Sequence, residues 1–334
     1  MLDMPLLLIV IIIFTLIFNY TNGAHDSANA IATIVSTKVL TPASAVIMAG
    51  ILNFIGTFIG SEVAETIGGE IVEQKIIMDC QIILLAAIIA GLLWNIFTWY
   101  LGLPSSSSHA LIGGLIGSAV AYGGWNSLKF VSIVEKIVLP LIFSPLAGFI
   151  GGYFLMVLLA RLFFRANPKK SNFAFKKLQI VSSAFMAISH GMNDAQKSMG
   201  IISLALFSFR IIPVFTIPLW VRIICALTLF FGTATGGWKI IKTMGHKIFA
   251  LEPVHGFAAE TSAALVITGA SLFGAPISTT HTISSSVLGV GSSKRFSAVR
   301  WGVATNMVIA WILTLPAAGI VGALCFYFLR LVGI

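Results

Sequence analysis

Residues 22–29, NGAHDSAN, return in altered form as residues 190–197, HGMNDAQK, roughly 170 positions further along the chain. A second motif is also repeated: residues 104–109, PSSSSH, are matched by residues 276–281, PISTTH. Two different motifs in the same order at nearly the same spacing indicate a duplicated unit. Paired polar stretches that interrupt apolar sequence in corresponding halves are typical of a transporter binding site.

The composition identifies the environment of the chain. Apolar residues make up 58% of the sequence and charged residues only 9%, and the mean hydropathy is +1.01. Soluble domains carry about a quarter charged residues. Apolar stretches of 20 residues or more recur along the whole length, which predicts membrane-spanning helices rather than the short alternating strands of a barrel.

Ten apolar segments, five in each half, follow from this pattern, and two of them contain the first motif in its two versions. Because about 20 residues span a bilayer as a helix, the longer segments are expected to be tilted or broken and the shorter ones re-entrant. We therefore predict an all-α integral membrane protein, an inverted-repeat transporter with about ten to twelve transmembrane or re-entrant helices and with broken helices at the binding site. The segments are 4–37, 42–61, 80–102, 105–122, 131–164, 178–209, 211–235, 254–273, 277–291 and 299–333.

The distribution of charge gives an orientation. A net charge of +9 would suggest nucleic acid in a soluble protein, but no such partner is expected here. If each segment crosses once, thirteen of the twenty basic residues share one side with residues 161–177, and the positive-inside rule places that stretch in the cytoplasm. Five crossings separate equivalent points, so the second half is expected to be inverted. The predicted divisions are a first repeat (1–165), a basic linker (166–177) and a second repeat (178–334), in a multi-pass protein of the cytoplasmic membrane.

The repeated aspartates predict a cation site. An ionised carboxylate within a membrane costs about 2.5 to 3.5 kcal/mol on insertion scales, so Asp26 and Asp194 are expected to face a polar cavity. Gly23 and Gly191 would allow the helix to unwind there and expose carbonyl oxygens, which with carboxylates and amides suit sodium. The alternative is that these stretches merely cap helices in a loop. The candidate cation-binding or coupling residues are Asn22, Asp26, Asn29, Asn193, Asp194 and Glu260, with Asp26 and Asp194 as the sodium ligands.

The repeated hydroxyl motif predicts an anion site. A proline ends one helix, and the Ser/Thr run after it begins the next, so two helix N-termini would converge from the two halves. The alternative is that these hydroxyls only cap their own helices. His109 and His281 are interpreted as hydrogen-bonding supports of the two turns rather than metal ligands. The candidate residues for this anion site are Ser105, Ser106, Ser107, Ser108, Ser278, Thr279, Thr280, Gln196 and Lys197.

Two residues break the symmetry between the halves. Lys197 stands where the first motif has Asn29, and its ammonium would occupy a cation position, pair with an aspartate or meet the anion directly. Glu260 is the remaining acid inside an apolar segment, and the cost of burying its charge makes it a functional candidate.

With these motifs the sequence resembles the inorganic phosphate transporter (PiT) family, over nearly the whole chain. The resemblance implies inverted repeats, a homodimer and cation-coupled uptake of phosphate. His25 stands where the family usually has Asn, and Met192 replaces a small residue. The pair Gln196 and Lys197 is similar to the bacterial branch of the family.

The preferred hypothesis is a symporter of inorganic phosphate coupled to sodium or protons, without enzymatic activity and without a cofactor. Phosphate is favoured over sulfate because it carries a proton near neutral pH and can donate a hydrogen bond. The alternatives are a permease for sulfate or another oxyanion and an intramembrane aspartyl protease with Asp26 and Asp194 as its dyad.

Overall fold

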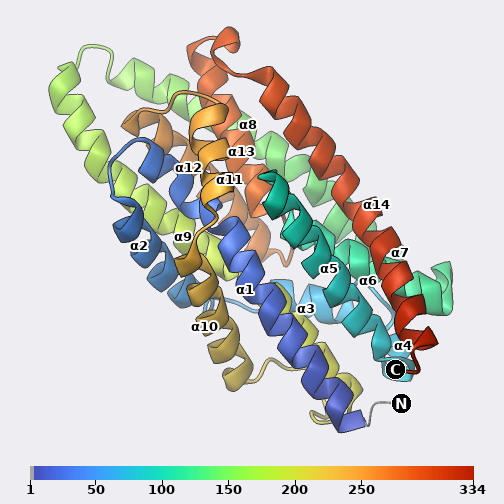
Figure 1. Cartoon of the computed structure of the whole chain (residues 1–334). Helices are drawn as coiled ribbons and strands as arrows, with labels where there is room; N and C mark the ends of the chain where they lie inside the picture. The colour runs from blue at the N-terminus through green and yellow to red at the C-terminus, as the bar shows by residue number, and fades with distance from the viewer. Residues whose placement is uncertain (1–3) are drawn as a thin grey trace.

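The computed structural model describes residues 4–334, and its elements are helices (Figure 1). The first half of the chain contains α1 (Met4–Ser36), α2 (Pro42–Gly56), α3 (Glu62–Gly69), α4 (Gln74–Asp79), α5 (Ile82–Leu101), α6 (Ser107–Gly123), α7 (Phe130–Ile133) and α8 (Leu139–Leu162). The second half contains α9 (Pro168–Ser208), α10 (Leu219–Thr235), α11 (Trp238–Lys242), α12 (Pro253–Leu272), α13 (Thr279–Lys294) and α14 (Trp301–Leu331). A π-helical turn, Val134–Val138, joins α7 to α8 as one long helix.

Most expected segments coincide with helices to within a few residues, and the exceptions have local causes. The segment expected to begin at residue 211 begins as α10 at Leu219, since Pro213 and Pro218 stop a helix from forming earlier. The basic stretch expected as a linker is largely helical, because Asn167 caps α9 by accepting hydrogen bonds from the backbone N–H groups of Lys169 (3.0 Å) and Lys170 (3.4 Å). The turn from α8 into α9 is therefore short (upper left of Figure 1).

Four helices among residues 4–334 are long and apolar enough to cross a membrane, namely α1, α5, the helix Phe130–Leu162 and α14. A fifth span is formed by α10 with Trp238–Gly245 if that pair, bent by 59°, counts as one broken crossing. The chain is thus a multi-pass membrane protein. Because α9 and α12 carry polar residues along their length, apolar length alone does not mark them as spans, and the total of ten to twelve stays a prediction.

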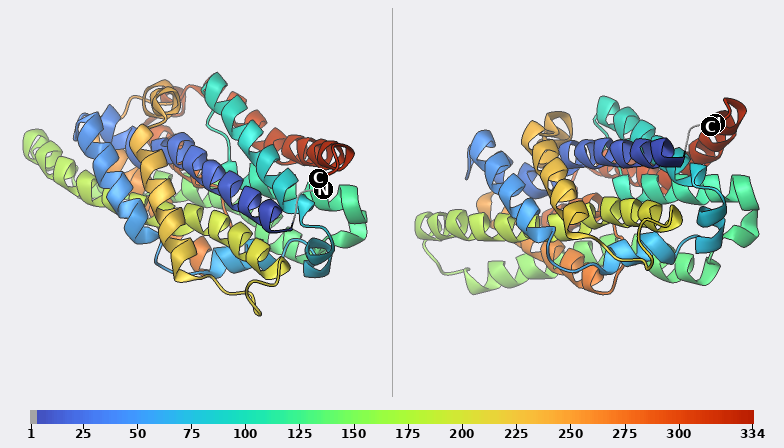
Figure 2. Two further views of the ribbon diagram at one scale, coloured as in Figure 1. Left: turned by 60° about the horizontal axis from the view of Figure 1, so that its bottom comes forward. Right: turned by 90° about the horizontal axis from the view of Figure 1, so that it is seen from below.

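The helices form a bundle with apolar outer sides and a polar interior. Figures 1 and 2 show the long helices side by side, with α14 packed along α6, α13 along α8, α12 along α9 and α1 along α10. Large apolar side chains point outward from α8 and α14, for example Phe154 (64% exposed) and Ile312 (67% exposed), whereas both repeated motifs are buried. This distribution fits a lipid environment around a polar centre.

Two of the breaks between packed helices lie at the hydroxyl motifs. α5 packs against α6 across the break at residues 102–106, and α12 packs against α13 across the break at residues 273–278. Pro104 and Pro276 lie in these breaks, so a new helix starts just after each of them.

The expectation of unwound turns at the aspartate motifs is wrong, because α1 and α9 run through them without interruption. The motif glycines serve helix packing instead. A Cβ atom at Gly23 would lie 2.7 Å from the carbonyl oxygen of Leu229 on α10, and one at Gly191 would collide with the backbone of Asn53 on α2. The backbone carbonyls of these two stretches are therefore not freed by unwinding.

Candidate ion-binding site

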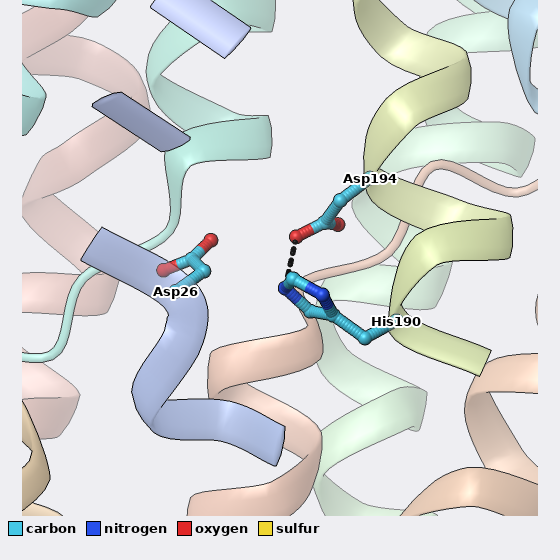
Figure 3. A group of neighbouring side chains, drawn as sticks. All are labelled: Asp26, His190 and Asp194. Atoms are coloured by element: carbon cyan, nitrogen blue, oxygen red, sulfur yellow. Dashed lines mark ion pairs between the residues drawn. The ribbon is translucent and has the colours of Figure 1, made fainter. Parts of the chain in front are cut away.

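The two aspartates face each other across the centre of the bundle (Figure 3). Asp26 comes from α1 and Asp194 from α9, and both are buried. One oxygen from each carboxylate and one ring nitrogen of His190 lie within 4.8 Å of one another, and His190 Nε2 lies 2.9 Å from Asp194 Oδ2. Two carboxylates and an imidazole form a donor set that suits a cation.

Asp26 receives hydrogen bonds from two hydroxyls and lies against a histidine ring. Ser107 Oγ donates to Oδ2 over 3.1 Å, and Thr280 Oγ1 donates to Oδ1 over 3.2 Å. His25 Nδ1 lies 2.7 Å from Oδ1, and the other ring nitrogen of His25 lies 3.2 Å from Thr98 Oγ1. A chain of polar contacts thus connects the carboxylate to α5, α6 and α13.

Asp194 is balanced by a positive charge. The ammonium of Lys197, one helical turn further along α9, forms an ion pair with Oδ1 and also donates to Ser108 Oγ. Thr279 Oγ1 donates to Oδ2 over 3.3 Å. Lys197 is only 1% exposed, so this ion pair lies in the interior of the protein, where an unpaired charge would be costly.

The two hydroxyl turns are built alike and meet. Ser106 caps α6 by accepting a hydrogen bond from the backbone N–H of His109, and Ser278 caps α13 by accepting one from the backbone N–H of His281, each over 3.2 Å. Ser108 Oγ donates to the carbonyl oxygen of Ile277 over 3.1 Å, which joins the two turns directly. Two helix N-termini with their partial positive charges therefore lie together.

Asn29 links the first aspartate motif to the second hydroxyl turn. Its Nδ2 donates to Thr279 Oγ1 (3.0 Å) and Thr280 Oγ1 (2.9 Å). Its amide oxygen and both polar atoms of the Asn22 side chain are buried without a hydrogen-bond partner among the described residues. Buried polar atoms are normally paired, so these atoms are available to bind a ligand or water.

The two histidines of the hydroxyl motifs hold the turns through their rings as well as their backbones. The rings of His109 and His281 stack with centroids 5.2 Å apart, and Trp311 stacks on His281 at 4.3 Å. Trp311 Nε1 donates to the carbonyl oxygen of Pro104 over 2.9 Å. Neither ring nitrogen of His281 has a hydrogen-bond partner in the described chain, so its ring supports the turns by packing.

Three of the candidate residues lie at the edge of this cluster. Ser105 Oγ donates to Thr98 Oγ1 over 2.8 Å, so it supports the polar chain to His25. Asn193 Nδ2 donates to Ser271 Oγ on α12 over 2.8 Å. The side-chain amide of Gln196 forms hydrogen bonds with backbone groups near the start of α3. It accepts from Val63 N (2.9 Å) and donates to the carbonyl oxygen of Ile59 (3.1 Å). The structure therefore gives Gln196 a packing role and does not place it at the hydroxyl turns.

Glu260 lies in a second polar cluster. Its carboxylate accepts hydrogen bonds from Thr33 on α1 and from Gln179 and Ser182 on α9. The residue is fully buried. Because Thr33 follows Asn29 by one helical turn, this cluster adjoins the aspartate cluster along α1 rather than belonging to it.

Sequence reasoning gave no role to His25, His190 and Thr98. Both histidines stood in the repeated motif, and a spacing of four residues would have placed His190 on the same helical face as Asp194. No sequence signal pointed to Thr98, because its position depends on the packing of α5 against α1.

Buried carboxylates facing two helix N-termini inside a multi-pass membrane protein define a transporter of small ions. The chain belongs to the phosphate transporter family, whose model matches residues 22–322. It is thus a phosphate transporter and not an enzyme.

Curated relatives and a solved structure agree with this assignment. Relatives named as probable low-affinity inorganic phosphate transporters include one from Bacillus subtilis (strain 168), 44% identical over 98% of both chains. Another, from Rhizobium meliloti (strain 1021), is 45% identical over 96% of both. A solved structure described as the sodium-dependent phosphate transporter matches with a TM-score of 0.89 at 27% identity, covering 98% of this chain and 99% of that one.

Proposed function

We propose that this protein takes up inorganic phosphate together with a cation, sodium or a proton, across the cytoplasmic membrane. The observation that supports the proposal most strongly is a pair of hydrogen bonds. The hydroxyls of Thr279 and Thr280, which belong to the proposed anion-binding turn, donate to Asp194 and Asp26. Groups suited to an anion and groups suited to a cation thus form one hydrogen-bonded network. The sodium dependence named for the similar solved structure supports cation coupling.

In this proposal phosphate binds between the starts of α6 and α13. The hydroxyls of Ser106 to Ser108 and of Ser278 to Thr280, with nearby backbone N–H groups, would donate to its oxygens. Lys197, which touches Ser108, would add a positive charge. Gln196 is left out because its amide is already engaged with backbone groups.

The cation binds at the carboxylates. Asp26 and Asp194 supply the charge, and the unpartnered amide oxygens of Asn22, Asn29 and Asn193 supply neutral ligands. A bound cation offsets the repulsion between the carboxylates and phosphate, so each ion improves the binding of the other. Glu260 would act as a coupling residue through Thr33, since both Asn29 and Thr33 belong to the same face of α1.

The architecture proposed for this activity is a pair of inverted halves, residues 1–165 and 178–334, with residues 161–177 in the cytoplasm and two copies of the chain in a homodimer. The support is that each half has a long helix carrying an aspartate motif, followed later by a hairpin carrying a hydroxyl motif. The excess of basic residues near residues 161–177 supports the orientation.

The test is uptake of labelled phosphate into proteoliposomes, with sodium and pH gradients imposed separately. Uptake driven by one of the two gradients supports symport and names the coupling ion, whereas uptake indifferent to both contradicts it. Sulfate transported as efficiently as phosphate would favour the oxyanion-permease alternative. The protease alternative is not retained, because the relatives are named transporters.

A further inference from the structure

Lys197 occupies on α9 the position that Asn29 occupies on α1, three residues after an aspartate in each case. We propose that the ammonium of Lys197 is a built-in cation that replaces one transported cation at Asp194, so that a single mobile cation, bound at Asp26, accompanies each phosphate. This inference rests on the proposed cation coupling and specifies its stoichiometry.

The contacts of Lys197 are those of an ion at the second carboxylate. Its ammonium lies against Asp194 Oδ1 and Ser108 Oγ, between the carboxylate and the anion-binding turn. Ser108 donates its own proton to the carbonyl oxygen of Ile277, so it accepts from Lys197. An ammonium has three donors, which leaves one for an oxygen of phosphate. The side chain is covalently tethered to α9 and 1% exposed, so its charge does not leave the protein with the transported ions.

The first carboxylate has no such partner. Asn29 turns its Nδ2 toward Thr279 and Thr280, and its amide oxygen remains unpartnered. Among the residues that the structure describes, no lysine or arginine forms an ion pair with Asp26. Asp26 is supported by the hydroxyls of Ser107 and Thr280 and lies 2.7 Å from a ring nitrogen of His25. The oxygens of Asp26, Asn22 and Asn29 are ligands that a mobile cation prefers.

The charge balance then fixes the number of ions. With both carboxylates ionised and the rings of His25 and His190 counted as neutral, two carboxylates and one ammonium leave one negative charge before phosphate arrives, and one monovalent cation neutralises it. A site with an amide at position 197 would leave two negative charges and call for two cations. The asymmetry between Asn29 and Lys197 therefore sets the coupling ratio.

The experiment measures the affinity of purified protein for labelled inorganic phosphate at a series of sodium concentrations and pH values. By linkage, the slope of log affinity against log cation concentration equals the number of cations bound with phosphate. We expect a slope of one for the natural chain and two for Lys197→Asn, with affinity at low cation reduced roughly 10- to 100-fold, as for loss of a charge-assisted hydrogen bond. Lys176→Asn, an exposed lysine on the same helix, is the matched control with a slope of one.

The reciprocal variant is Asn29→Lys, which is expected to bind phosphate with a slope near zero. A slope of one in Lys197→Asn would overturn the inference while leaving cation coupling intact. The inference would also be overturned if the Lys197→Asn protein kept the natural melting profile yet bound no phosphate at any cation concentration. A slope of zero in the natural chain would instead contradict the proposed function itself, and the inference with it.

Discussion

Thr279 and Thr280 are neighbours in the first turn of α13, yet their hydroxyls donate to carboxylates on different helices, to Asp194 over 3.3 Å and to Asp26 over 3.2 Å. Successive residues of a helix diverge by about 100°, so two adjacent hydroxyls reach two sides of one cluster of polar side chains. Asn29 contacts both hydroxyls and closes the network. A change at either threonine therefore alters contacts at the hydroxyl turn and at a carboxylate together.

Replacing Thr280 by Val removes the hydroxyl and keeps the shape of the side chain. We expect the affinity for phosphate to fall about tenfold, because Asp26 and Asn29 each lose a partner in a buried site. The affinity for the cation should fall as well. Equilibrium binding of labelled phosphate measures the first effect, and its cation dependence measures the second. Thr305→Ala, which changes an exposed hydroxyl on α14, is the control. A weaker phosphate affinity with unchanged cation dependence would contradict the shared network.

The aspartates are expected to differ in their effect on stability. Asp194→Asn leaves the ammonium of Lys197 buried without its counter-charge, which costs about 3 to 5 kcal/mol. Asp26→Asn removes a carboxylate that has no lysine or arginine partner in the described chain and should cost much less. Thermal unfolding in detergent compares the two. The double variant Asp194→Asn with Lys197→Gln should recover most of the stability that Asp194→Asn loses. Equal destabilisation by Asp194→Asn and Asp26→Asn would argue against the ion pair.

Gly191 is expected to tolerate no side chain. A Cβ atom there meets the backbone of Asn53, so Gly191→Ala must push α9 away from α2 at a cost of about 1 to 3 kcal/mol. Gly302→Ala, where a Cβ meets nothing within 4 Å, should be neutral or slightly stabilising. The melting temperatures of the two proteins are compared with that of the natural chain. An unchanged melting temperature in Gly191→Ala would contradict the close contact with α2 and favour an unwound turn.

Glu260→Gln is expected to separate binding from coupling. The amide keeps the size of the side chain and one acceptor oxygen for Thr33 or Ser182, but it removes the charge. Because Glu260 does not touch the hydroxyl turns, phosphate affinity should change less than threefold. This change corresponds to a smaller free energy than a typical hydrogen bond contributes. Uptake driven by the cation gradient should fall by tenfold or more. Unimpaired gradient-driven uptake would remove Glu260 from the coupling mechanism.

The sequence predicted much of this site because the motif residues repeat and each motif is local. Proline followed by Ser106 or Ser278 specifies where α6 and α13 start, and the structure has those caps. Gly23 and Gly191 misled the prediction, since glycine serves a bend and a close helix contact equally well and only the packed partner distinguishes them. The sequence marked Glu260 as a candidate, but the contacts of Gln196 with α3 and of Glu260 with Thr33 join residues distant in sequence, so no local pattern revealed these contacts.

The central claim is that phosphate and the coupling cation bind in one network and strengthen each other. The direct measurement is the dissociation constant of phosphate for the purified protein as sodium and proton concentrations are raised one at a time, together with the reciprocal titration of the cation at several phosphate concentrations. We expect one of the two cations to lower the dissociation constant of phosphate, and phosphate to lower the dissociation constant of that cation by the same factor. A phosphate affinity that is independent of both cations would contradict it.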